Sequence, residues 1–120
     1  MKYHAEALEI SRSINYAKGE ALQLGNLGIL AFYKGNEDES LLLFQDSLSI
    51  YKRISIKRGI AEQYGNIGMI LYRKSNFDEA LKYVCNAIHT FREAGDRMGE
   101  ADQLGNIGLI QYENVILMKH

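Results

Sequence analysis

The sequence repeats itself every 40 residues, and this period constrains the fold more than any other feature. The stretches Gln23–Phe32, Gln63–Tyr72 and Gln103–Tyr112 read QLGNLGILAF, QYGNIGMILY and QLGNIGLIQY. The segments 59–72 and 99–112 are identical at nine of fourteen positions. A fixed period of this size indicates a repeat architecture.

The period divides the chain into units. Two full units span 19–58 and 59–98, a half unit at 1–18 precedes them, and a half unit at 99–120 follows. Each full unit is expected to hold two helices joined by a turn. The sequence therefore predicts a single all-α domain, an α-solenoid of stacked helix-turn-helix hairpins with about six helices.

Helical periodicity and turn residues mark both helices of the second unit. The first is expected from about residue 58 to residue 74, with four residues on one face: Tyr64, Ile67, Gly68 and Leu71. The acidic residues of "FDEA" suit the start of a second helix, and Gly95-Asp96 suits its end and the next start. The first unit ends with "RISIKRG", which lacks a Gly-Asp pair, so a tighter or more helical turn is expected there.

The segment 63–88, "QYGNIGMILYRKSNFDEALKYVCNAI", resembles the tetratricopeptide repeat. The 40-residue period is similar to the subclass found in kinesin light chains, in cell-polarity adaptors that bind disordered peptides, and in bacterial peptide-sensing regulators. The resemblance covers the chain up to Glu113. It implies a right-handed superhelix in which the first helix of each unit lines a concave groove. The residues that carry the match are Tyr64, Ile67, Gly68, Leu71, Tyr72, Ala80 and Ala87.

Glycine recurs inside the predicted first helices, although it costs about 0.8–1 kcal/mol there relative to alanine. One series falls on the inward face beside Leu27, Ile67 and Ile107. A missing side chain on that face lets the partner helix approach closely, which recovers dispersion and burial. This inward series is Gly28, Gly68 and Gly108.

A second apolar face points away from the partner helix, and the resemblance assigns it to the concave groove. It would present a floor of glycines, a row of large apolar residues and an aromatic row, flanked by asparagines and by a last row of mixed charge. The expected peptide-binding residues are Gly25, Asn26, Ile29, Phe32, Tyr33, Gly65, Asn66, Met69, Tyr72, Arg73, Gly105, Asn106, Leu109 and Tyr112.

Two interpretations of this face stay open. An apolar peptide could dock above the glycines and stack on the aromatic rings, or tight superhelical curvature could bury the face between neighbouring units. The asparagines either hold the backbone of an extended ligand or form hydrogen bonds that fix the angle between units. If the groove is used, the residues of differing charge, Tyr33, Arg73 and Glu113, are the expected source of selectivity.

Composition and motifs argue against other classes of protein. A net charge of −1 argues against a nucleic-acid partner, and no apolar run approaches the ~20 residues of a membrane span. The single cysteine, Cys85, allows no disulfide within the chain, so the default is a cytoplasmic protein. His4, His89 and His120 lie far apart and predict no metal site. Because no phosphate loop or convergent reactive set is recognised, neither a cofactor nor enzyme activity is expected.

Two functions remain. The first is an interaction scaffold or adaptor that takes a peptide or helix of a protein partner in its apolar concave groove. The alternative is self-assembly into a homo-oligomer, in which an orphan second helix at about 2–17 pairs with an orphan first helix at about 97–114 of another chain. An excised piece of a longer solenoid would have the same open half units.

Overall fold

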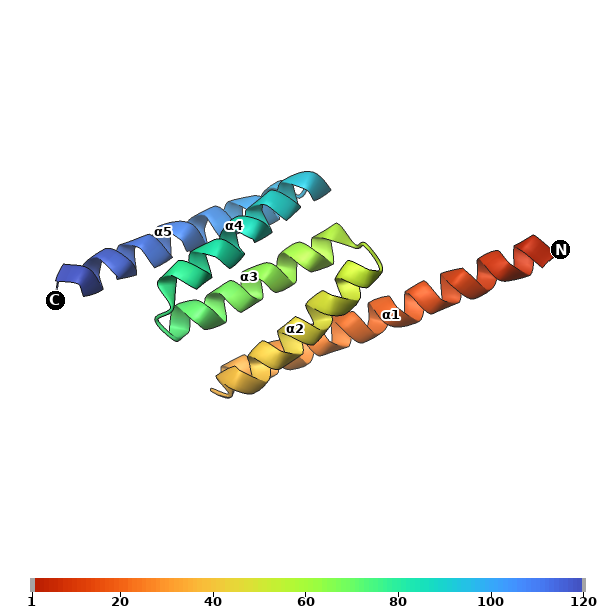
Figure 1. Ribbon diagram of the computed structural model, residues 1–120, viewed down its shortest axis with the longest axis horizontal. Coiled ribbons are helices and arrows are strands. Elements are labelled where there is room, and N and C mark those ends of the chain that lie inside the picture. The colour runs from red at the N-terminus through yellow and green to blue at the C-terminus, as the bar shows by residue number, and fades with distance from the viewer. Residues whose placement is uncertain (1, 120) are drawn as a thin grey trace.

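The computed structural model in Figure 1 describes the backbone of residues 2–119 and the side chains of residues 6–118. The all-α architecture predicted from the period is confirmed, with five helices among residues 2–119 in place of about six. No strand occurs in this described part of the chain. The helices are α1 (Lys2–Tyr33), α2 (Glu37–Arg53), α3 (Lys57–Arg73), α4 (Phe77–Ala94) and α5 (Arg97–Lys119).

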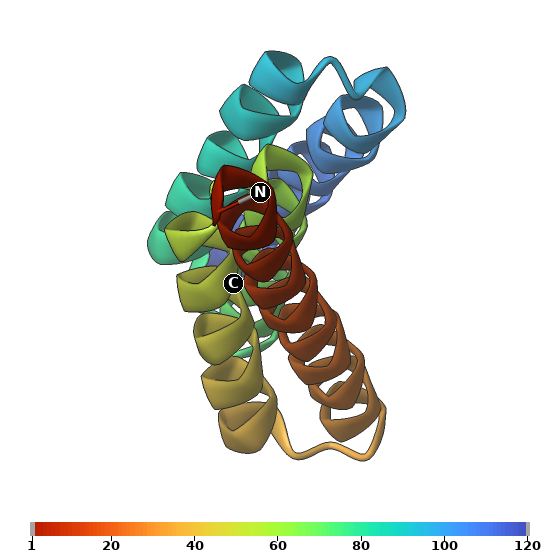
Figure 2. The same cartoon turned by 90° about the vertical axis from the view of Figure 1, so that its right-hand side faces the viewer.

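The helices pack as consecutive antiparallel neighbours. α1 packs against α2, α2 against α3, α3 against α4, and α4 against α5, while α3 and α5 also touch each other. The result is an elongated stack of 69 × 30 × 18 Å, in which the ends of α1 and α5 project on opposite sides (Figure 1). Figure 2 shows the hairpins α1–α2 and α3–α4 lying one behind the other along the stack, with α5 following.

Helix α1 runs without a break through the expected unit boundary between residues 18 and 19. The separate helix predicted at about 2–17 is therefore not formed, and its residues are the first half of α1. Within the described chain, this half has no earlier helix of its own unit to fold against. Continuing the helix adds one backbone hydrogen bond per residue, so the unbroken form is the favourable one.

The turns after α1, α2, α3 and α4 share one geometry. The residue with a positive φ is the second after α1, α2 and α3 and the first after α4. In each turn, this residue and the next one donate their N–H groups back to the last helical turn in a Schellman motif. In the turn after α2, the N–H of Ser55 lies 3.2 Å from the carbonyl oxygen of Lys52, and that of Ile56 lies 3.1 Å from Tyr51 O. The residues with positive φ are Gly35, Ser55, Ser75 and Gly95.

Two expectations about these turns have different outcomes. Gly95 adopts the left-handed conformation with φ 71°, and Asp96 Oδ1 accepts a hydrogen bond of 3.0 Å from the N–H of Gly99, so the predicted cap is confirmed. The tighter turn expected after α2 is wrong. Ser55 adopts φ 58° there, because the Schellman bonds and the packing of α2 on α3 impose the same turn despite the cost to a residue with a Cβ.

The core is a continuous apolar layer between successive helices. Phe44 and Leu48 of α2 pack with Ile67 and Ile70 of α3, and a similar cluster joins α4 to Ile110 of α5. Small residues of the second helices face the first helices. Where the first unit has serine in place of alanine, the hydroxyls are satisfied: Ser40 Oγ and Ser47 Oγ each donate a 2.7 Å hydrogen bond, to Gly28 O and Ala21 O.

Close helix approach was predicted at all three inward glycines, and the structure shows it at two of them. A Cβ at Gly28 would lie 2.6 Å from the ring of Phe44, and one at Gly68 would lie 2.7 Å from Val84 Cγ2. At Gly108 a Cβ would meet no described atom within 4 Å, because no described helix covers that side of α5. Leu27, predicted to face inward, is 43% exposed for the corresponding reason at the other end of the stack.

Candidate binding groove

The first helices of the units place the predicted groove residues along one side of the stack. In the middle row, Met69 is half-buried, and Ile29 and Leu109 are 40% and 42% exposed. In the aromatic row, Phe32 and Tyr72 are half-buried, whereas Tyr112 is 64% exposed. Curvature therefore buries part of this face but does not seal it.

The predicted floor of open glycines is wrong for two of its three members. Gly25 and Gly65 are buried, and a Cβ added to them would lie 3.2 Å and 2.6 Å from Nε2 of Gln63 and Gln103, respectively. A glutamine side chain from the first helix of the following unit thus packs over each of these glycines. Only at Gly105 is the position free of described atoms within 4 Å.

These glutamines were not among the residues predicted for the groove. Gln63 is only 4% exposed, and its Oε1 accepts a hydrogen bond of 3.4 Å from Asn66 Nδ2. The same pair recurs one unit later, where Asn106 Nδ2 lies 3.3 Å from Gln103 Oε1. The signal was present in the sequence, because glutamine recurs with the 40-residue step. Asn66 and Asn106 thus each donate a hydrogen bond to a glutamine of their own helix, and that glutamine packs on the preceding unit.

An apolar hollow of about 310 Å³ opens between α1 and α3. Its lining combines large apolar and aromatic side chains with one carboxamide. That composition suits an apolar side chain of a ligand whose backbone needs a hydrogen-bond partner. The lining residues, each predicted from the sequence for the groove, are Ile29, Phe32, Tyr33, Asn66 and Met69.

A second hollow of about 310 Å³ lies between α3 and α5 and is more polar. Asn66 lines both hollows, so the two adjoin along α3. In the second hollow, Arg58 Nε lies 2.9 Å from Asp96 Oδ2. The N–H of Gly99, helped by Arg58, holds the pKa of Asp96 below its ordinary value, whereas burial raises the pKa of Glu62.

The charged row beside the aromatics is engaged with the preceding unit. The guanidinium of Arg73 stacks over the ring of Phe32 at 4.8 Å, and its Nε lies 3.3 Å from Glu37 Oε1. Burial raises the pKa of Tyr72, and the neighbouring carboxylate of Glu113 adds to that shift. Arg73 is therefore partly committed to contacts with α1 and α2, whereas Tyr33, which has the same position in the first unit, is 80% exposed.

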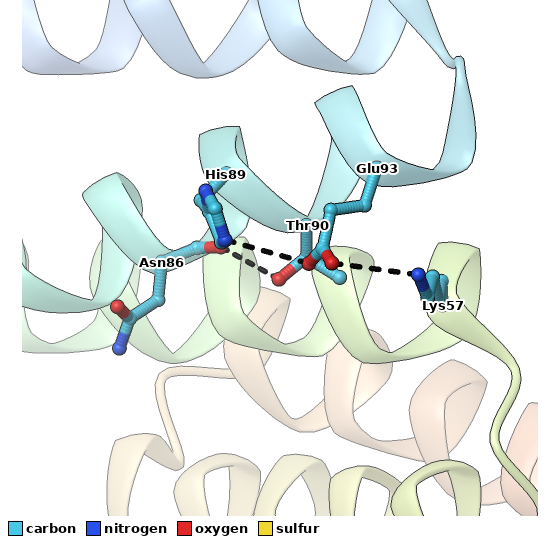
Figure 3. A network of polar contacts seen from close by, with 5 residues as sticks. All are labelled: Lys57, Asn86, His89, Thr90 and Glu93. Carbon is cyan, nitrogen blue, oxygen red and sulfur yellow. Dashed lines mark hydrogen bonds and ion pairs between the residues drawn. The ribbon is translucent and has the colours of Figure 1, made fainter.

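Among the side chains of residues 6–118, no three histidines, cysteines or acidic residues cluster as metal ligands. Cys85 is exposed, and His89 lies on the exposed side of α4, with Nε2 3.5 Å from Glu93 Oε1 (Figure 3). Glu93 also pairs with Lys57 of α3 at 3.4 Å. His4 and His120 lie outside the described side chains.

No helix within residues 2–119 combines the length and the apolar character needed to cross a lipid bilayer. Helix α1 is 32 residues long, but its apolar residues are interspersed with charged ones. Its length therefore reflects the fusion of two predicted helices.

Stacked helical hairpins with a repeated contact between successive first helices define an all-α repeat solenoid. Residues 21–55 match the tetratricopeptide repeat family model. This match covers the second part of α1, helix α2 and the turn after α2, and the all-α solenoid fold agrees with it. The resemblance to the subclass with the 40-residue period stays a prediction.

One solved structure with a similar fold is the crystal structure of BtubC (BKLC) from P. vanneervenii, with a TM-score of 0.71 and 21% sequence identity. The likeness covers 78% of this chain and 39% of that one, so this chain matches well under half of the longer protein. No curated protein matched the sequence.

Proposed function

We propose that the chain is a non-catalytic interaction scaffold that binds an apolar segment of a protein partner in its concave groove. The observation that carries this proposal is the hollow between α1 and α3, where Ile29, Phe32 and Met69 present apolar surface that the fold leaves accessible. Each large apolar side chain left outside a core forgoes about 1.5–3 kcal/mol of burial, so a row of them favours a partner that covers it.

The groove is suited to an extended peptide for two reasons. The apolar hollow and the polar hollow adjoin at Asn66, so a ligand lying along them would meet apolar and polar surroundings in turn. The carboxamide of Asn66 has its Nδ2 directed to Gln63, and its oxygen can accept a hydrogen bond from a ligand N–H. The side chain thus supports both the neighbouring unit and a ligand backbone.

A library of short random peptides displayed on phage tests this function. Peptides selected on the immobilised protein would be titrated by fluorescence anisotropy against the wild-type chain and Met69→Lys. The expected result is apolar residues in the selected peptides and at least a 10-fold loss of affinity in Met69→Lys, because a charge is placed in the hollow. The matched control is Leu42→Lys, which changes an exposed leucine of α2 outside both hollows. Equal binding by both variants would contradict the groove as the site.

Self-association is the second candidate function. It is favoured by the free glycine positions on α5, where Gly105 and Gly108 lack the neighbours that their counterparts Gly65 and Gly68 have within the described chain. Leu104 on the same helix is 49% exposed. Sedimentation velocity over a wide range of concentration tests it. A mass that rises with concentration is expected, and a strict monomer would contradict it.

A further inference from the structure

Helix α1 contains a turn residue at a position where no turn is made. The left-handed residues of the described turns, Gly35, Ser55, Ser75 and Gly95, recur every 20 positions. The position 20 residues before Gly35 is Asn15, which lies inside α1. Asparagine is among the few residues other than glycine that adopt this conformation readily. The sequence therefore keeps a suitable hinge residue in register within an unbroken helix.

Gly19, the first glycine after Asn15, lacks the aromatic neighbour that its counterparts one and two units later have. Gly59 and Gly99 are each covered by the ring of an aromatic residue eight positions earlier, Tyr51 and Phe91, which comes back across the turn. Gly19 holds the same register, but a Cβ there would meet nothing described within 4 Å. In this register the chain has Ser11 instead of an aromatic residue, and because α1 is continuous, Ser11 lies about 12 Å away along the helix axis and cannot reach Gly19.

The two ends of the stack carry complementary unfilled positions. Gln63 sits on Gly25 and Gln103 sits on Gly65, so the next glycine in this series is Gly105, which is free of described neighbours. At the opposite end, the exposed Gln23 has the register of these glutamines. It lines a hollow of about 380 Å³ on α1, together with Asn15, Tyr16, Gly19 and Glu20.

A second contact series ends in the same way. Arg73 stacks over Phe32, and Glu113 lies beside Tyr72, so each aromatic residue of the row meets the residue 41 positions later. The next aromatic residue, Tyr112, is 64% exposed. Tyr33, which has the register of Arg73 and Glu113, is 80% exposed.

We propose that a second copy of this chain continues the solenoid head to tail. In this contact α1 of the second copy breaks at Asn15, and the part before the break packs on α5 of the first copy as the second helix of that unit. Gln23 then sits on Gly105 of the other copy. The inference rests on the proposed self-association and names its geometry. The occupant is a second copy because the contact continues the α1–α3 and α3–α5 interfaces with the residue pairs that those interfaces already use.

Burial supports the role given to the first half of α1. Leu8 has the register of Leu48 and Ile88, which are 8% and 6% exposed, yet Leu8 is 48% exposed on the free part of α1. Packing against α5 would bury it as its counterparts are buried. Since the contact joins unlike surfaces, it leaves one free surface of each kind and builds arrays longer than a dimer unless a ring closes.

The first test changes the hinge and measures association by sedimentation velocity. Asn15→Gly is expected to tighten association about 5-fold, and Asn15→Ala to weaken it about 5-fold, because the two residues differ in the cost of a left-handed turn. The matched control is Ser13→Gly, which places glycine two positions away, where no turn is proposed. Its association constant is expected to stay near that of the wild type.

The second test fixes the contact by cross-linking in a Cys85→Ser background. One sample carries Gln23→Cys, another carries Gly105→Cys, and the equimolar mixture is treated with a short bismaleimide. Interchain cross-links are expected in the mixture and not in either sample alone. A chain with both Gly25→Cys and Gln63→Cys is the positive control, because it should cross-link within the chain at every concentration.

The outcomes separate the two levels of the proposal. Association without cross-links between positions 23 and 105, and without a response to the Asn15 substitutions, would overturn this geometry and leave self-association standing. A strict monomer at all concentrations would overturn both.

Discussion

Gln63 of α3 reaches Gly25 of α1, and its Nε2 would lie only 3.2 Å from a Cβ placed on that glycine. The contact recurs between Gln103 and Gly65, where the corresponding distance is 2.6 Å. A glycine in a first helix and a glutamine in the next first helix thus form a repeated joint on the groove side of the stack. This joint explains why the helices keep a residue that lowers their propensity.

A double-mutant cycle on Gln63 and Gly25 tests the joint. Gln63→Ala is expected to lower the free energy of unfolding by about 1–2 kcal/mol, because it removes buried contacts over Gly25. Gly25→Ala alone should be close to neutral, since gained helix propensity offsets crowding of the flexible amide. In the Gln63→Ala background the same change should stabilise by about 1 kcal/mol. Additive effects in urea denaturation would contradict the contact.

The inward glycines predict opposite outcomes for the same substitution in two units. Gly68→Ala is expected to destabilise the fold by about 1–2 kcal/mol, because the new Cβ would lie 2.7 Å from Val84 Cγ2 and 3.3 Å from the carbonyl oxygen of Ala80. Gly108→Ala should stabilise α5 by about 0.8–1 kcal/mol, because it meets open space among the described residues. Thermal unfolding of both variants measures the difference. Equal signs would show that close packing does not set the cost at Gly68.

The serine turns predict a gain in stability. Ser75 adopts φ 62° in the turn after α3, and Gly95 adopts φ 71° at the corresponding position of the turn after α4. Ser75→Gly removes the steric cost of the left-handed conformation and is expected to stabilise by about 0.5–1 kcal/mol after the larger chain entropy of glycine is offset. Gly95→Ala should be destabilising by a similar amount. Chemical denaturation measures both changes, and a loss of stability in Ser75→Gly would contradict the strain assigned to this turn.

The helical hairpins could be predicted from the sequence because the apolar helix face and the turn residues that define them are both local features. The helical face containing Ile67 and Gly68 and the Gly95-Asp96 pair place α3 and the start of α5 within a residue or two of their observed bounds. The unbroken α1 was not predicted, because a break near the expected unit boundary at residues 18 and 19 depends on whether a neighbouring helix is present to pack against the first half, which the local sequence does not specify.

Only the part of the candidate site that lies on one helical face could be predicted from the sequence. The helical wheel identifies Ile29, Phe32 and Met69 as one face, and these residues do line one hollow. It does not show that Gln63 fills the space over Gly25, because that contact joins residues 38 positions apart on different helices.

The pKa of Asp96 predicts a pH dependence of stability. Its carboxylate accepts the Gly99 N–H and pairs with Arg58, so its pKa is lower in the folded state than in the unfolded state. This stabilisation is complete above the unfolded pKa and is lost as the pH falls through the lower folded value. Asp96→Asn keeps the cap but removes the charge, so it should be less stable than the wild type at neutral pH and approach it in acid. A difference that is constant with pH would contradict the assignment.

The most direct test of the proposed groove is methyl NMR of the chain titrated with a peptide selected from the phage library. Binding in the hollow between α1 and α3 predicts shifts of the Ile29 and Met69 methyl resonances that saturate together, while the Leu42 methyls of α2 stay unchanged. Saturable binding that shifts Leu42 and leaves Ile29 and Met69 unperturbed would contradict the concave groove as the binding surface.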